Sequence, residues 1–222
     1  MKPRAILFDM DGVVVDSMRF HASAWMQVLG EYGIAMEDID IYLREGMSGR
    51  QSVEDIFREY GRPVPDEARF NELVARKHAI FERNRITLFP CMGEILDHVK
   101  TGGLWAALVT GSMRRSVDHV MEGSFLSLFN AVITAEDVSH GKPDPEPYAR
   151  ALEKLGVDPS DALAIENAPM GIRSARGAGV TCYAIETTLP RRYLKEADEI
   201  FADHCSLLQH LMSGRMLMGR AR

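Results

Sequence analysis

Residues 5–12 read AILFDMDG, a short apolar run that ends in two aspartates, Asp9 and Asp11, followed by Gly12. A short apolar run bounded by a turn signal is typical of a buried strand in a parallel sheet. Because ligands bind at the carboxyl ends of such strands, we expect both carboxylates at a binding crevice. One carboxylate could then act as a nucleophile while the other handles protons, if nearby positive charge limits their repulsion. The alternative is that the pair only shapes a turn, as Asp-Gly sequences often do.

The order of apolar runs along the chain predicts the fold class. Helical stripes separate five further strand-like runs, at 104–109, 131–134, 162–165, 181–185 and 199–202. Such alternation predicts an α/β fold with a doubly wound, mostly parallel sheet. Residues 16–87 break the alternation, because they show only helical patterns with turn signals between them. We therefore expect a Rossmann-like catalytic core, formed by 1–15 and 88–222, with an all-α cap domain inserted at 16–87 over the aspartates.

Composition excludes several classes of partner. The 222 residues carry a formal net charge of −6, so no basic surface for nucleic acid is expected. No apolar stretch approaches the roughly 20 residues of a transmembrane helix, and no secretory signal segment begins the sequence. The three cysteines, Cys91, Cys182 and Cys205, are few and lack metal-site spacing, which predicts reduced, structural thiols. We expect a cytoplasmic protein that acts as a monomer, although no motif bears on its oligomeric state.

Two later strand ends carry groups suited to holding an anion beside Asp9. Thr110, Gly111 and Ser112 follow the second strand-like run and open a predicted helix. Backbone N–H groups at a helix start bind phosphate oxygens, and glycine permits close approach. Ser112 could instead serve only as a helix cap. Lys142 lies in a proline-rich loop, GKPDP, where its charge would offset repulsion between carboxylate and phosphate.

Two polar residues interrupt apolar stripes within the expected cap. His21 shares a helical stripe with Trp25, and Lys77 shares another with Phe81. Taken alone, His21 is better explained as a hydrogen-bonded core histidine. A lysine, however, is rarely buried without a partner. We therefore expect both side chains to face the cleft between cap and core.

Four segments, in this order, resemble the haloacid dehalogenase superfamily of phosphotransferases, in its branch with a helical cap after the first strand. They are DMDGVVVDS at 9–17, LVTGS at 108–112, GKPDP at 141–145 and IENAPMGI at 165–172. The resemblance implies that Asp9 attacks phosphorus to form an aspartyl-phosphate, with Thr110 and Lys142 in the same catalytic set. It also implies that Asp11 protonates the leaving oxygen and then deprotonates water. Crowding by carboxylates is expected to raise the pKa of Asp11 towards the working range.

The resemblance further implies a Mg²⁺ ion, held by Asp9, the backbone carbonyl of Asp11 and the Glu166–Asn167 corner. Many relatives have aspartate where this chain has Asn167, and a neutral amide oxygen is a weaker ligand. Glu45 could compensate, because it replaces the lysine found in the cap loop of the family's sugar-phosphate mutases. Within this branch, the chain most resembles the pattern of the inorganic pyrophosphatase member. In that member, a cap glutamate reaches the metal. The alternative is that Glu45 ends a helix facing solvent.

These residues predict a Mg²⁺-dependent phosphohydrolase that acts on a small phosphorylated compound. Gly111, Ser112, His21, Arg50 and Lys77 are the expected phosphate- and substrate-binding residues. Pyrophosphate is the favoured substrate, with phosphomonoesters close behind. The enzymatic alternative is a mutase of the β-phosphoglucomutase type, which must return the phosphoryl group to sugar faster than water takes it. A third hypothesis is a non-catalytic phosphate-binding protein of the same fold, since Asn167 weakens the metal corner.

Overall fold

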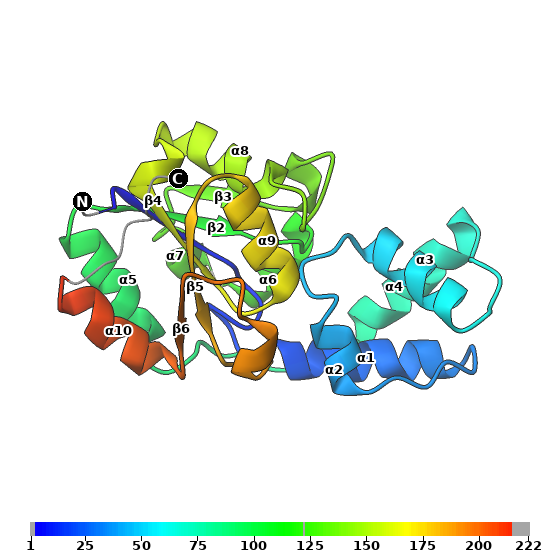
Figure 1. The fold of residues 1–222 in the computed structure, drawn as a ribbon. Coiled ribbons are helices and arrows are strands. Elements are labelled where there is room, and N and C mark those ends of the chain that lie inside the picture. The colour runs from blue at the N-terminus through cyan, green and yellow to red at the C-terminus, as the bar shows by residue number, and fades with distance from the viewer. Residues whose placement is uncertain (1–2, 122, 215–222) are drawn as a thin grey trace.

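The computed structural model describes residues 3–121 and 123–214, and its centre is a parallel sheet (Figure 1). The sheet has six strands in the order β3-β2-β1-β4-β5-β6. Their bounds are β1 (Ala5–Phe8), β2 (Trp105–Val109), β3 (Ala131–Ile133), β4 (Ala162–Glu166), β5 (Thr181–Ile185) and β6 (Glu199–Phe201). The chain moves outward in opposite directions from β1 and β4, so the strand order reverses between them. Because Asp9 directly follows β1, it lies at this switch point, where open α/β sheets bind ligands.

Alternate residues of β1 enter different apolar layers, one on each face of the sheet. Ile6 and Phe8 pack with α5 (Met92–Thr101) and α10 (His204–Met212). Ala5 and Leu7 pack with α8 (Glu146–Leu155) and α9 (Pro169–Gly177). A strand that is apolar on both faces is expected where helices cover both sides of a parallel sheet. The predicted α/β fold with a doubly wound sheet is therefore confirmed.

Four helices between β1 and α5 lie together at one side of the sheet (Figure 1). They are α1 (Met18–Gly30), α2 (Asp38–Tyr42), α3 (Gly49–Glu59) and α4 (Glu67–Phe81). They share a separate apolar cluster that includes Leu29, Phe57 and Leu73. We call these helices and their loops the cap; its boundaries at 16 and 87 stay a prediction.

The two linkers between cap and core run side by side. Val15 and Leu88 form an isolated antiparallel bridge. On either side of it, Asp16 N–H donates to the carbonyl of Thr87 at 2.9 Å, and Phe89 N–H donates to the carbonyl of Val14 at 3.3 Å. The cap is thus joined to the core by a short two-stranded ribbon that begins three residues after Asp11.

The remaining elements are short and lie in the core. They are the helices α6 (Arg114–Val120) and α7 (Gly123–Leu126) and the 3₁₀ turns Ala135–Asp137, Pro159–Asp161 and Arg191–Tyr193. No helix in the described part of the chain is long and apolar enough to cross a membrane.

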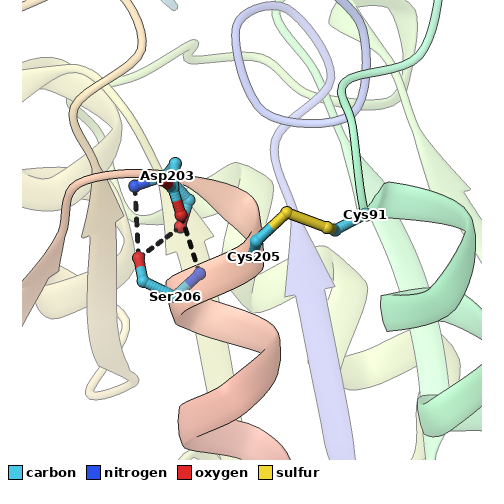
Figure 2. The surroundings of a disulfide bond; sticks show 4 residues. All are labelled: Cys91, Asp203, Cys205 and Ser206. Carbon is cyan, nitrogen blue, oxygen red and sulfur yellow. Dashed lines mark hydrogen bonds between the residues drawn. A yellow bond between two sulfur atoms is a disulfide. The ribbon is translucent and has the colours of Figure 1, made fainter.

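A disulfide joins Cys91 to Cys205 (Figure 2). Cys91 caps the start of α5 and Cys205 lies in the first turn of α10, and their Cα atoms are 5.4 Å apart. The prediction of reduced thiols is wrong for this pair. A separation of 114 residues gives no spacing pattern, and only the packing of α5 against α10 brings the sulfurs together. Cys182 is a buried free thiol. Because disulfides are typical of oxidising compartments, the cysteines no longer support the expected cytoplasmic location.

Candidate active site

Lys142 holds two carboxylates together at the switch point of the sheet. Its Nζ donates to Asp9 Oδ1 at 2.6 Å, to Glu166 Oε1 at 2.7 Å and to the carbonyl of Val109 at 3.1 Å. Tyr148 adds a hydroxyl, which donates to Glu166 Oε1 at 2.7 Å. These side chains are almost fully buried, so each charge depends on its partners rather than on water. The ammonium group is therefore fixed beside the Asp9 carboxylate.

Burial dominates the electrostatics of this group. It raises the pKa of Asp9 to about 8, and the Glu166 and Asp11 carboxylates add to this effect while Lys142 opposes it. Burial disfavours the charged form of Lys142, but Asp9 and Glu166 outweigh it and raise the pKa of Lys142 above its usual value. A second cation beside Asp9 would favour the carboxylate form that a nucleophile requires.

Gly171 in α9 leaves the space that Glu166 occupies. A Cβ atom at this position would overlap the Glu166 carboxylate itself. We expect Gly171→Ala to push Glu166 away from Lys142, leaving buried charges poorly paired. The free energy of unfolding should fall by roughly 2–4 kcal/mol. Any activity of the site should fall at least about tenfold, because a displacement of 1 Å in a positioning group can cost about a hundredfold.

Gly93→Ala in α5 is the matched control, since no atom lies within 4 Å of its Cβ position. This variant should be as stable as the unmodified protein, or more stable by up to about 1 kcal/mol. Chemical denaturation measures the effect on stability, and an assay of enzymatic turnover measures the effect on activity. Equal behaviour of the two variants would show that the Glu166 position is not confined.

Asp11 accepts hydrogen bonds from three side chains. Ser17 Oγ donates to Asp11 Oδ1 at 2.5 Å, His21 Nε2 lies 3.1 Å from the same oxygen, and Ser112 Oγ donates to Oδ2 at 3.0 Å. Burial alone would raise the pKa of Asp11, but His21 and the two hydroxyls lower it to about 2. The prediction that this pKa is raised is therefore wrong, because the three donors outweigh the effect of burial. Asp11 is therefore ionised at neutral pH.

A cap lysine extends the hydrogen bonds around Asp11. Lys77 Nζ lies 2.7 Å from His21 Nδ1, and the His21 ring stacks on Phe81 with 4.0 Å between ring centroids. Burial and the Lys77 charge lower the pKa of His21, so the imidazole is neutral. Since Lys77 donates to Nδ1, the ring proton resides on Nε2 and is donated to Asp11. Burial also lowers the pKa of Lys77, to about 8.

Asn167 connects the core to the cap glutamate. Its Nδ2 donates to Glu45 Oε1 at 3.1 Å and Oε2 at 3.0 Å, and also lies 3.1 Å from Thr188 Oγ1. Burial and the Asp9 carboxylate raise the pKa of Glu45 well above its usual value. The alternative in which Glu45 faces solvent is wrong, because the loop after α2 turns its carboxylate into the site.

The residues at this corner fit a Mg²⁺ ion. Asn167 Oδ1 is buried and has no hydrogen-bond partner among the described residues, so one hard oxygen donor is unused. The pKa values of Asp9 and Glu45 are raised, and a cation bound beside these carboxylates would lower them. Within 3–121 and 123–214, no three His, Cys, Asp or Glu side chains are grouped closely enough to hold a metal alone. Mg²⁺ does not need such a group, since it usually binds one or two carboxylates, water and substrate phosphate.

The segment Thr110–Ser112 turns its polar groups inward. Ser112 N–H donates to Thr110 Oγ1 at 3.0 Å, while the Ser112 hydroxyl binds Asp11. Helix α6 begins at Arg114 with Met113 as its N-cap, so the alternative that Ser112 only caps this helix is wrong. Gly111 lies against the cap: its Cβ position is 3.1 Å from the carbonyl oxygen of Gly46.

A cavity of about 360 Å³ lies between the cap and the core. Nine of the predicted site residues line it: Asp9, Asp11, His21, Glu45, Arg50, Lys77, Thr110, Gly111 and Ser112. Lys142, Glu166 and Asn167 are buried and reach it through Asp9 and Glu45. Arg50 lines the cavity but pairs with Glu67 and stacks over Phe70 at 4.3 Å, so its charge is already engaged.

Sequence reasoning missed Tyr148 and Thr188. Tyr148 falls on the apolar stripe of α8, and a tyrosine on such a stripe gives no sign that its hydroxyl binds Glu166. Thr188 lies outside every motif and meets Asn167 only because the loop after β5 folds over the corner.

Comparison with known proteins agrees with this geometry. Residues 6–185 match the family of haloacid dehalogenase-like hydrolases. Hexitol phosphatase A from Escherichia coli K12 is 30% identical over 89% of this chain and 90% of its own length. Pyrophosphatase PpaX from Oceanobacillus iheyensis is 29% identical over 88% of this chain and 89% of its own. A Bacteroides vulgatus structure, assigned provisionally as a beta-phosphoglucomutase, has a TM-score of 0.87 at 31% identity and covers 99% of this chain and 91% of its own. The chain therefore belongs to the haloacid dehalogenase-like hydrolase family, as its motifs predicted.

Proposed function

We propose that this hydrolase is a Mg²⁺-dependent phosphatase that works through an aspartyl-phosphate at Asp9. The observation that carries the proposal is the position of the Asp9 carboxylate, which lines the cavity while buried Lys142 holds its Oδ1. A nucleophile needs an oxygen exposed to substrate and a fixed cation beside it. Asp9 has both. The names of two relatives, a hexitol phosphatase and a pyrophosphatase, agree with phosphoryl transfer to water.

The proposed reaction has two steps. First, a carboxylate oxygen of Asp9 attacks phosphorus, and the bond from phosphorus to the leaving oxygen breaks. Asp11 passes a proton to the leaving oxygen. It takes this proton from Nε2 of His21, and Lys77 gives a proton to Nδ1 of the same ring. Second, Asp11 takes a proton from water while the water oxygen attacks phosphorus, and the bond from phosphorus to Asp9 breaks. The proton then returns from Asp11 through His21 to Lys77.

Asp9, the backbone carbonyl of Asp11 and Asn167 Oδ1 would hold Mg²⁺, with Glu45 beside them. When bound, the ion would draw charge from the phosphoryl oxygens. Lys142 would offset the negative charge of the Asp9 carboxylate beside the phosphoryl group. Thr110 and Ser112 line the cavity and would contact the phosphoryl oxygens. Arg50 and Lys77 remain the proposed cap contacts to substrate.

Phosphate release from small esters should require Mg²⁺, stop with a chelator and return when Mg²⁺ is restored. Glu45→Gln should raise the Mg²⁺ concentration for half-maximal activity by about tenfold, because partners of metal ligands typically contribute ten- to hundredfold in affinity. A Mg²⁺ titration of phosphate release measures this shift.

Glu54→Gln on α3 removes the same charge from the cap at a half-buried position paired with Arg58. It should leave the Mg²⁺ requirement unchanged. Metal-independent release of phosphate by the unmodified protein would contradict the proposal.

Pyrophosphate is the second candidate substrate. The contact between Glu45 and Asn167 supports it, because a cap carboxylate at the metal corner suits a compact anion that brings its own metal-binding oxygens. The PpaX relative is named as a pyrophosphatase. Faster release of phosphate from pyrophosphate than from every ester in a panel would favour it. Conversion of one sugar phosphate into its isomer would instead favour the mutase alternative.

A further inference from the structure

Much of the cavity wall beyond the reacting groups is apolar, although Arg44, Arg50, His78 and Glu136 also line it. Trp25, Met47, Phe70 and Val74 line it from the cap, and Met113 lines it from the core. None of these five side chains is fully buried, and Met113 is 45% exposed. Large apolar side chains kept half-exposed around a polar centre are typical of a surface that contacts ligand.

This wall begins immediately beside the proposed chemistry. Met47 is two residues from Glu45, and Met113 directly follows Ser112. Gly46 lies between the two cap residues with φ 84° and packs on the side chain of Lys142, so the loop that carries Met47 touches the catalytic lysine. A leaving group bonded to a phosphoryl group at Asp9 would meet apolar side chains from both cap and core.

The long cations that line the cavity already have protein partners. Arg44 pairs with Glu59 at 2.5 Å, and Arg50 pairs with Glu67. Lys77 binds His21 and lies 4.9 Å from the centre of the Phe81 ring. A second phosphate group would have to compete for these cations, whereas a hydrocarbon group would not.

We propose that the substrate is a phosphate monoester whose leaving group carries a hydrocarbon or aromatic surface, rather than pyrophosphate or a densely hydroxylated sugar phosphate. This inference rests on the proposed function, because it concerns the leaving group of that same reaction. The cavity volume of about 360 Å³ is in the range of pockets for organic ligands. Burial of on the order of 60 Å² of additional apolar surface in the transition state corresponds to a factor of about ten in kcat/KM.

Cyclohexylmethyl phosphate and glucose 6-phosphate test the inference directly. Both place a six-membered ring on a primary phosphate ester, and they differ chiefly in the hydroxyl groups. We expect kcat/KM with Mg²⁺ to be at least about tenfold higher for cyclohexylmethyl phosphate, and higher than for pyrophosphate. Glucose 6-phosphate or pyrophosphate turned over equally fast, or faster, overturns the inference and leaves the phosphatase function standing. If none of the three releases phosphate in a Mg²⁺-dependent reaction, both proposals fail.

Two methionine variants test whether the apolar wall is the source of the preference for cyclohexylmethyl phosphate. Met113→Gln replaces an exposed part of the wall with a polar side chain of similar length, so its fold should be kept. It should lower the ratio of the two kcat/KM values at least about threefold. Met212→Gln is the control, because Met212 is 65% exposed in the last turn of α10 and does not line the cavity. An unchanged ratio in Met113→Gln, or an equal change in both variants, contradicts the proposal that the apolar wall contacts the leaving group.

Discussion

Asp9→Asn is expected to lower kcat/KM for phosphate release at least about a thousandfold, as removal of a nucleophile does in other hydrolases. Asparagine has nearly the shape of aspartate, but its amide cannot form an acyl-phosphate. The measurement is phosphate release with saturating Mg²⁺, together with acid quenching after a brief reaction with radiolabelled substrate. The unmodified protein should retain acid-stable label, and the variant should retain none.

Asp16→Asn is the matched control for this experiment. It makes the same change in the same motif, at a residue that pairs with Arg19 at 3.4 Å on the surface. Its activity should stay within a few-fold of the unmodified protein, because surface ion pairs contribute little. Wild-type turnover by Asp9→Asn, with no loss of the label, would show that another group attacks phosphorus.

Loss of the Cys91–Cys205 disulfide has the largest expected effect on stability. The bond closes a loop of 114 residues, and the chain-entropy account gives at most about 5 kcal/mol for a loop of this length. The double variant Cys91→Ser/Cys205→Ser should therefore unfold at clearly lower denaturant concentration. Treatment of the unmodified protein with a reducing agent should reproduce the shift.

Cys182→Ala separates this effect from general thiol chemistry. Cys182 is buried and forms no disulfide, so this variant should respond to the reducing agent as the unmodified protein does. If the double variant were as stable as the unmodified protein under oxidising conditions, this would contradict a stabilising disulfide between α5 and α10. The native pairing would then contribute nothing measurable.

The core of the site could be predicted from the sequence because strand ends converge. Asp9 and Lys142 are 133 positions apart. Asp9 directly follows β1, and Lys142 lies in the connection that leaves β3, beyond the 3₁₀ turn Ala135–Asp137. Carboxyl ends of parallel strands share one edge of the sheet, so charged residues in the connections that leave those ends can meet there. The helical pattern after β1 likewise indicated that a cap would lie over the aspartates.

What escaped prediction depends on packing between elements rather than on any one element. The pKa of Asp11 is lowered by donors from the linker, from α1 and from the loop after β2, and no pattern along the chain combines these three. The contact between Glu45 and Asn167 crosses from cap to core over 122 positions. The sequence could offer Glu45 as a candidate, but only the folded loop shows where its carboxylate points.

The cap contributes side chains to the site as well as covering it, and the paired linkers are its connection to the core. His21 and Glu45 belong to the cap, and their partners Asp11 and Asn167 belong to the core. Swinging the cap about the Val15–Leu88 bridge would separate both pairs in one movement. Proton delivery and metal retention would then be switched on together by docking. With the cap away from the core, the enzyme would leave its substrate unhydrolysed. A substitution that loosens the linkers would then lower activity without changing any side chain of the site.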